Sequence, residues 1–300
     1  MTDSPIKIIG VGGAGCGTVE AVMSSDCAKD CELLGVNTDA ASLLRSSLKT
    51  KLLLGRNVTK GRSTGNDMKL GEAAAIEEKE KLKAMLAGAK AVFVVAGIGG
   101  GTGAGASPVI ASIARENKSL VIAFVTVPFK AEGKACGENA AEAISKLKSN
   151  ADLIVLVQSD RVLELTHSMP MAEAFSKINE VRLECIESMV QVMTQSGLEE
   201  VRPMLKGFAT IGVGYGLTVR EASENSLKHL MITQGVLNVS GLILNVLIPH
   251  RFFSGSVVDA VDHMSRQLPD AKIIWVSGMK ESLISKAEVI ALSIGVSFAL

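Results

Sequence analysis

Short runs of apolar residues alternate with amphipathic segments along the first half of the chain. The runs Ile6–Val11, 91–96 and Leu120–Val127 are almost continuously apolar, as expected for strands that a parallel sheet buries on both faces. Segments with helical periodicity lie between them. This alternation predicts an α/β protein with a mostly parallel, Rossmann-like sheet and helices on both faces. Further strands are expected at residues 33–36, 52–54 and 153–157, and helices at 15–24, 72–86, 108–116 (with Pro108 in its first turn) and 137–148.

The second half begins with a long helical pattern over residues 170–194. Its apolar positions recur at spacings that predict burial against protein on more than one side. Beyond it, strands at 208–214, 242–249, 272–276 and 288–294, with helices at 221–232 and 257–267, predict a smaller α+β domain. We therefore expect three parts: an N-terminal domain over residues 1–168, a central helix and following loop over 169–205, and the α+β domain over 206–300.

Charge and composition narrow the function classes. The 300 residues include 31 Lys and Arg against 31 Asp and Glu, so the formal net charge is zero. A protein without excess positive charge is a poor candidate for binding nucleic acid or an anionic membrane surface. The sequence shows no signal peptide and no apolar run of about 18 residues. We expect a cytoplasmic protein with no nucleic-acid partner and no direct membrane insertion.

Cysteine and histidine follow no metal-binding pattern. The chain has five cysteines, an odd number, and four scattered histidines, and neither set has the spacing of a zinc site. We expect reduced thiols, as is usual in the cytoplasm, and no dedicated metal cage.

The first candidate for chemistry is the segment Gly10-Val-Gly12-Gly13-Ala-Gly15, which follows a predicted strand and opens a predicted helix. It fits the pattern G-x-G-x-x-G, in which glycines let the backbone approach a phosphate and the helix N-terminus stabilises the negative charge. On its own the segment permits a dinucleotide site of the NAD type, with Asp39 after the next strand as a candidate ribose acceptor.

The second candidate runs from Gly99 to Gly105 and has five glycines in seven residues. Ordered glycines lose more conformational entropy than other residues, so such a run is unfavourable as a simple turn. Inward-facing backbone amides, with the hydroxyl of Thr102, suit a di- or triphosphate. At Gly100 and Gly101 a side chain is expected to clash with phosphate or to forbid the backbone angles. An NAD enzyme does not need this second loop, and the loop lacks the lysine of a P-loop NTPase.

The run Gly99-Gly-Gly-Thr-Gly-Ala-Gly105 resembles the signature of the tubulin/FtsZ family. The resemblance covers nearly the whole chain and implies a GTP-binding domain, a long central helix and a smaller C-terminal domain. The tail peptide through which bacterial FtsZ binds adaptors is expected to be absent, because the sequence ends at Leu300. Further FtsZ-like segments follow in family order: Gly10 to Gly15, Asn37-Thr-Asp-Ala40, Thr59-Lys-Gly61 through Gly71-Glu72, Pro128-Phe129, Glu132-Gly-Lys134, Ala174-Phe175 and Ile274-Trp275.

Carried over position by position, the resemblance implies a site for GTP or GDP. The two glycine-rich loops would hold the phosphates, Asp39 would reach Mg²⁺ through water, and Glu132 would contact the ribose. Phe175 would cover the guanine face, and either Asn179 or Glu180 would read the guanine edge. Plain core packing of Phe175 and a solvated Asn179 are the alternatives. The implied nucleotide contacts are Gly12, Gly13, Gly15, Asp39, Thr64, Gly65, Gly99, Gly100, Gly101, Thr102, Gly103, Glu132, Phe175 and Asn179, with Thr64 and Gly65 near the γ-phosphate.

Several positions depart from the family pattern. Cys16 and Gly17 stand where FtsZ commonly has paired asparagines, and Cys136 replaces an expected arginine. A Pro-Asn pair is replaced by Gln158 and Ser159. Each change removes a polar contact to the nucleotide, so we expect weaker affinity than is usual in the family.

The largest departure follows the central helix. FtsZ carries there a loop whose two aspartates enter the next subunit's site and position the attacking water. Here the segment is shorter and has Glu199 and Glu200 instead. Such catalysis depends on positioning, and an error of about 1 Å costs roughly a hundredfold in rate.

Two hypotheses therefore follow from the resemblance. The first is an FtsZ-like cytoskeletal protein that self-associates through its nucleotide face and C-terminal domain and hydrolyses GTP slowly. The second is a nucleotide-binding regulatory or structural protein that neither hydrolyses GTP efficiently nor forms such filaments. The NAD-type enzyme is a remote third, because it leaves the second glycine-rich loop unexplained.

Overall fold

The computed structural model describes residues 5–166, 170–232, 239–249, 255–281 and 283–297. The chain forms two compact units, Met1–Leu183 and Glu184–Ala299. The long helix α8 (Met171–Gln195) belongs to the first unit up to Leu183 and to the second from Glu184. This helix confirms the pattern seen at residues 170–194. The three-part domain division at 168 and 205 stays a prediction.

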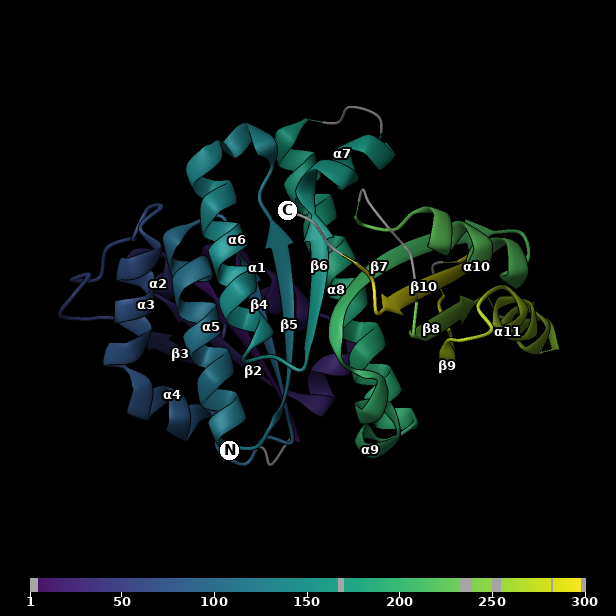
Figure 1. Cartoon of the computed structure of the whole chain (residues 1–300), viewed down its shortest axis with the longest axis horizontal. Coiled ribbons are helices and arrows are strands. Elements are labelled where there is room, and N and C mark those ends of the chain that lie inside the picture. Colours follow the sequence, from purple (N-terminus) through teal and green to yellow (C-terminus); the bar gives the residue numbers. More distant parts are fainter. Residues whose placement is uncertain (1–4, 167–169, 233–238, 250–254, 282, 298–300) are drawn as a thin grey trace. The chain divides into compact units, whose positions relative to one another are not determined.

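Parallel strands form the sheet of the first unit, in the order β3-β2-β1-β4-β5-β6. The chain builds outward from β1 in one direction and then from β4 in the other, so the strand order reverses between these two neighbours. The predicted α/β class with a mostly parallel sheet is confirmed (Figure 1). The strands are β1 (Ile6–Val11), β2 (Cys31–Asn37), β3 (Thr50–Leu53), β4 (Ala91–Gly97), β5 (Leu120–Val127) and β6 (Leu153–Gln158).

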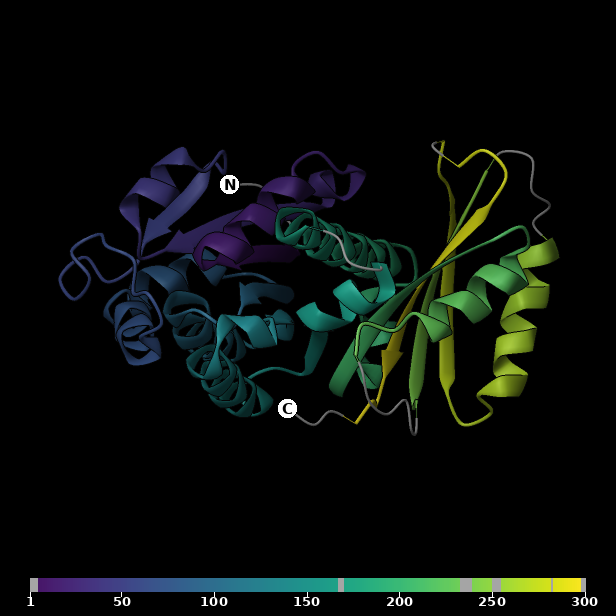
Figure 2. The ribbon, with the colours of Figure 1, turned by 90° about the horizontal axis from the view of Figure 1, so that it is seen from above.

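Helices cover both faces of this sheet. Helix α1 lies on one face, and α5 and α6 lie on the other, as the view in Figure 2 shows. Helices α3 and α4 pack on α5. The helices of the first unit, besides the start of α8, are α1 (Gly12–Val22), α2 (Ala40–Arg45), α3 (Met68–Glu77), α4 (Lys79–Leu86), α5 (Gly101–Glu116), α6 (Lys134–Lys148) and α7 (Ser159–Thr166).

Two predicted helices differ from the structure by more than a shift of three or four residues at an end. The helix expected at 108–116 begins at Gly101, so Pro108 lies inside α5 and not in its first turn. Close packing overrides glycine's low helix propensity there, because a side chain at Gly103 or Gly105 would overlap the backbone of neighbouring segments. The helix expected at 72–86 is broken into α3 and α4 at Glu78, which is buried and forms an ion pair with Lys81.

The second unit is a sheet covered on one face by two helices. Its strand order is β7-β10-β8-β9, in which β10 runs antiparallel to both neighbours and β8 pairs parallel with β9. This arrangement confirms the predicted α+β character. The elements after α8 are α9 (Leu198–Val201), β7 (Gly207–Gly216), α10 (Val219–Lys228), β8 (Gly241–Ile248), α11 (Gly255–Gln267), β9 (Lys272–Met279) and β10 (Ala287–Ile294).

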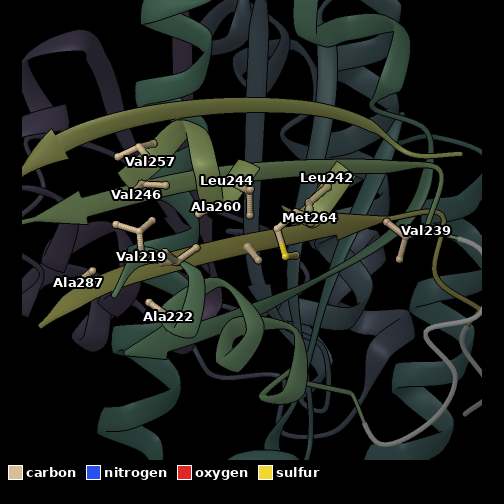
Figure 3. Packing of buried hydrophobic residues seen from close by; sticks show 12 residues of the cluster. Val219, Ala222, Val239, Leu242, Leu244, Val246, Val257, Ala260, Met264 and Ala287 are labelled. Carbon is tan, nitrogen blue, oxygen red and sulfur yellow. The ribbon is translucent and has the colours of Figure 1, made fainter. Parts of the chain in front are cut away.

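The core of the second unit lies between β8 and the helices α10 and α11. Leu242, Leu244 and Val246 alternate along β8 and point toward these helices, as Figure 3 shows. Ala222 of α10 and Met264 of α11 close the cluster and are fully buried. Of the helices in the described ranges, none is long and apolar enough to cross a bilayer.

Candidate functional site

A cavity of about 310 Å³ opens in the first unit at the carboxyl ends of its parallel strands. Its wall includes Val11 and Gly97, the last residues of β1 and β4, which lie side by side where the strand order reverses. Open α/β sheets bind their ligands at this place. The rest of the wall consists of Gly12, Gly13, Ala14, Asn37, Asp39, Ser42, Ser63, Gly65, Gly99, Gly100, Gly101, Thr102, Gly103, Thr126, Pro128, Glu132, Ser159, Phe175, Ile178 and Arg182.

Two α-helices begin at this cavity without a side-chain cap. The N-cap residues of α1 and α5 are Val11 and Gly100, neither of which caps with its side chain, and neither helix has an acidic residue in its first turn. By contrast, Asp39 and Asp67 cap α2 and α3 with carboxylate oxygens. The first N–H groups of a helix have no partner within it, and its N-terminus carries partial positive charge. The cavity therefore offers backbone donors from two helix ends to an anion.

Three glycines of the wall differ in what a side chain at their position would meet. A Cβ at Gly13 would meet nothing within 4 Å, and one at Gly100 would have Gly65 O as its nearest neighbour, at 3.8 Å. Gly12 has a φ of +70°, and a Cβ there would lie 3.4 Å from Gly103 N, which brings the starts of α1 and α5 together. Gly13 and Gly100 are thus open positions, while Gly12 is needed for its backbone angle.

Two other predicted glycines serve the packing of the backbone. Gly15 is not part of the wall, and a Cβ there would overlap the carbonyl of Val95 in β4. At Gly101 a side chain would overlap the backbone of Asp67. Gly101 also donates its N–H to Gly65 O at 2.7 Å, so it fixes the loop that carries Gly65.

Three threonine hydroxyls form a buried network beside the wall. Thr102 Oγ1 lies 2.8 Å from Thr38 Oγ1 and 2.9 Å from Thr64 Oγ1, and all three side chains are buried. The network joins the start of α5 to the loop after β2, which carries Thr38, and to the loop before α3, which carries Thr64. Thr64 therefore acts on the cavity through Thr102, because Thr64 itself is not part of the wall.

We expect Thr102→Val to destabilise the protein, because the hydroxyls of Thr38 and Thr64 would then lose the partner they share. The expected loss is about 1–3 kcal/mol in the free energy of unfolding, measured by urea denaturation. Thr102→Ser keeps the hydroxyl and is the matched control. Equal stability of Thr102→Val and the unchanged protein would show that the network contributes nothing.

Two carboxylates lie in the wall. Asp39 Oδ1 accepts the N–H of Ser42 at 2.8 Å, and Glu132 Oε1 accepts the N–H of Phe129 at 2.8 Å. Each carboxylate is therefore oriented by the backbone through one oxygen. Mg²⁺ in nucleotide sites is commonly held by one or two carboxylates with phosphate oxygens and water, and Asp39 fits such a role. Across the residues that the structure covers, no group of three His, Cys, Asp or Glu side chains is placed to hold a metal ion.

Phe175 exposes 47% of its surface although it lies in the wall. Its ring packs edge-on against the buried Phe129, with ring centroids 5.2 Å apart and planes at 89°. Phe129 therefore supports the ring of Phe175, about half of which stays exposed at the cavity.

The two candidates for reading a base edge lie differently. Asn179 is outside the wall, and its Oδ1 accepts hydrogen bonds from Thr18 Oγ1 at 3.3 Å and from Arg182 Nη2. Glu180 is exposed and forms an ion pair with Lys177 at 2.6 Å. The role of either residue toward a ligand stays a prediction.

Arg182 belongs to the wall but escaped the sequence interpretation. Its side chain is buried, and neither Nε nor Nη1 has a hydrogen-bond partner. Burial lowers the pKa of its guanidinium to about 10, so the group stays charged at neutral pH. A signal was present in the sequence: position 182 is four residues after Ile178 and seven after Phe175, so an arginine falls on the apolar face of the helix.

Two of the positions that depart from the family pattern, Cys16 and Gly17, lie on α1. Cys16 points inward and donates from Sγ to Gly10 O and Val36 O at 3.4 and 3.5 Å. Burial raises the pKa of this thiol to about 12, so it is protonated at neutral pH. A Cβ at Gly17 would meet nothing within 4 Å.

Glu199 and Glu200 lie in the short helix α9 of the second unit. Both side chains are exposed, while Val201 and Leu205 beside them are buried. The segment starts at Gly197, whose φ of +85° sets the turn after α8, and Lys272 Nζ approaches Glu200 O at 3.4 Å. The backbone of this segment is thus anchored while its two carboxylates face outward.

Comparison with known proteins supports the family resemblance found in the sequence. Residues 5–167 match the model of the Tubulin/FtsZ family, GTPase domain. The chain is 32% identical to Cell division protein FtsZ 1 of Pyrococcus furiosus over 97% of this chain and 81% of that protein. Its structure is similar to an FtsZ dimer of M. jannaschii, with a TM-score of 0.90 and 30% identity over 97% of this chain and 88% of that one. The GTPgS-bound protofilament of CetZ2 from Haloferax volcanii shares the fold, with a TM-score of 0.77 and 22% identity over 97% and 93% of the two chains.

Proposed function

Because this chain belongs to the tubulin/FtsZ family, we propose that it is an FtsZ-like cytoskeletal protein that binds GTP and GDP in the cavity of its first unit. The observation that carries the proposal is the pair of uncapped helix N-termini, α1 and α5, in one cavity wall. A di- or triphosphate supplies the negative charge and the acceptors that these helix ends need. An NAD-type enzyme does not account for the second helix end.

Within this proposal each end of the cavity has its own task. Backbone N–H groups of the two glycine-rich loops hold the phosphates, and Thr102 adds a hydroxyl. Glu132 binds the ribose through the oxygen that does not cap Phe129. Phe175 stacks on the base with its partly exposed ring.

A magnesium ion would be held by Asp39, directly or through water, together with phosphate oxygens. The ion would neutralise charge that develops on the phosphates. Asp39 itself is oriented for this by its bond to the N–H of Ser42, which leaves its second oxygen available.

Hydrolysis would require a second copy of the chain. Water would attack the γ-phosphorus as the bond to the β–γ bridging oxygen breaks, giving GDP and phosphate, and the water's proton would pass to a carboxylate or to solvent. We propose Glu200, with Glu199, as the groups that orient this water from the neighbouring copy. Their placement on a short helix differs from a loop built for this task, so slow turnover is part of the proposal.

Self-association follows from the family relation as a proposal. A relative 30% identical to this chain is described as a dimer, and a neighbour of the same fold as a protofilament. We propose contact between the nucleotide face of one copy and the C-terminal domain of the next. The second candidate function, a GTP-binding regulatory protein without efficient hydrolysis, is favoured only by the placement of Glu199 and Glu200 on the short helix α9.

We expect GTP to bind at least about tenfold more tightly than ATP, which corresponds to about 1.4 kcal/mol. Adenine presents a donor where guanine presents an acceptor, and a mismatched edge leaves buried polar groups unpaired. Isothermal titration calorimetry on protein freed of nucleotide measures both constants. NAD is the control ligand for the excluded dinucleotide function. Equal affinities for GTP and ATP would contradict guanine recognition, and binding of neither would contradict the proposed function itself.

A further inference from the structure

Arg182 is the one arginine or lysine in the wall of the cavity, within the part of the chain that the structure covers. Only 4% of its surface is exposed. Its Nη2 donates to Asn179 Oδ1 and, at 3.5 Å, to Ala14 O, both of which are neutral acceptors. Nε and Nη1 together carry three further N–H groups and have no partner.

A buried guanidinium with unpaired donors is costly to a folded protein. Leaving a buried donor unsatisfied costs about 1–3 kcal/mol, and more for a charged group. An apolar side chain of similar volume at this position would avoid the cost. The arrangement is therefore explained best by a ligand that brings acceptors to Arg182.

The side chain of Arg182 runs back along α8 toward the cavity's aromatic wall. Its bond to Asn179, three residues earlier, fixes this direction, which is also the usual lean of side chains on a helix. Phe175 and Ile178 lie on the same face of α8 and are both wall residues. A flat ring stacked on Phe175 would extend one edge toward the guanidinium.

The same bond fixes the amide of Asn179. Arginine can only donate, so the atom that faces Arg182 must be Oδ1. The single hydroxyl hydrogen of Thr18 is shared between that oxygen, at 3.3 Å, and Ala14 O, at 3.1 Å. The bond to Arg182 therefore turns Oδ1 toward the guanidinium and leaves the amide nitrogen of Asn179 as a donor. Arg182 and Asn179 together therefore form a donor-rich edge.

We propose that Arg182 determines base specificity by donating to the acceptors O6 and N7 of a guanine base. The proposal rests on the proposed function, and it includes a small rotation of the guanidinium when the nucleotide enters. Guanine presents two neighbouring acceptors on this edge, for which arginine is the best-matched side chain. Adenine presents only N7, beside an amino group that would face the donors of Arg182.

The test uses base analogues that change one edge at a time. Binding of GTP, 7-deaza-GTP, 6-thio-GTP and ITP is measured by calorimetry on the full chain. We expect 7-deaza-GTP and 6-thio-GTP to bind about tenfold more weakly than GTP, because they lose or weaken N7 and O6. ITP lacks only the amino group at C2, and we expect its affinity to lie within about twofold of that of GTP.

The matched variants are Arg182→Met, which keeps the volume, and Arg220→Met, an exposed arginine of α10 outside the cavity wall. In Arg182→Met the penalties for 7-deaza-GTP and 6-thio-GTP should disappear, while Arg220→Met should keep them. If a thermal melt shows that Arg182→Met is not folded, the affinities of the unchanged protein for the analogues still test whether N7 and O6 are recognised.

Three results would overturn the proposal. The first is equal affinity for GTP and 7-deaza-GTP combined with weak binding of ITP, which would place recognition at N1 and N2. The second is an analogue penalty that survives Arg182→Met. The third is the absence of GTP binding by the unchanged protein, which would overturn the proposed function together with this inference, whereas the first two leave GTP binding in place.

Discussion

Replacing Gly100 by valine should abolish nucleotide binding and leave the fold intact. Gly100 is the N-cap of α5, with φ −85° and ψ 162°, angles that valine adopts readily. The nearest atom to a Cβ at this position would be Gly65 O, at 3.8 Å, so a Cβ would meet no protein atom closely. It would instead occupy the space beside the first N–H groups of α5, where we propose that a phosphate binds. We expect a loss of affinity of at least about a hundredfold in calorimetry.

The stability of Gly100→Val shows whether the loss of nucleotide binding comes from the site itself or from unfolding of the protein. The melting temperature of Gly100→Val should fall by less than about 4 °C. The sole expected cost is that valine is a poorer N-cap residue than glycine. Gly137→Val in α6 is the matched control, since a Cβ there also meets nothing within 4 Å and Gly137 is outside the wall. Gly15→Ala is the opposite case and should destabilise the protein through its overlap with Val95. Retained nucleotide affinity in Gly100→Val would place the phosphate site elsewhere.

The second large effect concerns turnover. We expect GTP hydrolysis to be roughly a hundredfold slower than in a family member with a full aspartate loop, while GTP binding stays clear. Binding depends on the first unit, whereas the proposed hydrolytic groups lie on α9 of the second. Glu200→Ala should lower the remaining rate further and leave the GTP dissociation constant unchanged.

Phosphate release at several protein concentrations measures this turnover. A site completed by a neighbouring copy must show a rate per molecule that rises with concentration. Glu80→Ala, an exposed glutamate of α4 outside the cavity wall, is the control for a simple loss of charge. Fast release that rises steeply with concentration would show that Glu199 and Glu200 do replace the aspartate pair. A rate unaffected by Glu200→Ala would remove this residue from the proposed mechanism.

Most strands of the fold could be predicted because burial on both faces leaves a continuous apolar run. Ile6–Val11 and Leu120–Val127 were predicted to the residue. The start of α5 could not be predicted, since glycine disfavours a helix and only the close approach of α5 to its neighbours makes Gly101 helical. Helix α2 was missed although Asp39 followed by alanines carried the signal of an N-cap.

The site was predicted in part for a similar reason. Glycine-rich loops can be recognised in the sequence, and most of their predicted residues lie in the cavity wall. Contacts between side chains that are far apart in the sequence cannot be recognised in this way. The hydroxyl network of Thr38, Thr64 and Thr102 and the placement of Arg182 against the first turn of α1 depend on how distant segments meet.

The order in which wall residues occur along the chain has a consequence for biosynthesis. The residues of the two uncapped helix ends have all been synthesised once Gly103 has been made, whereas Phe175 and Arg182 follow more than seventy residues later. At about 5–20 residues per second, a ribosome needs roughly 4–15 s to cover that interval. Under the proposed function, the residues that hold the phosphates are therefore synthesised several seconds before those that select the base, so only a nearly finished first unit contains every residue needed to discriminate among nucleotides.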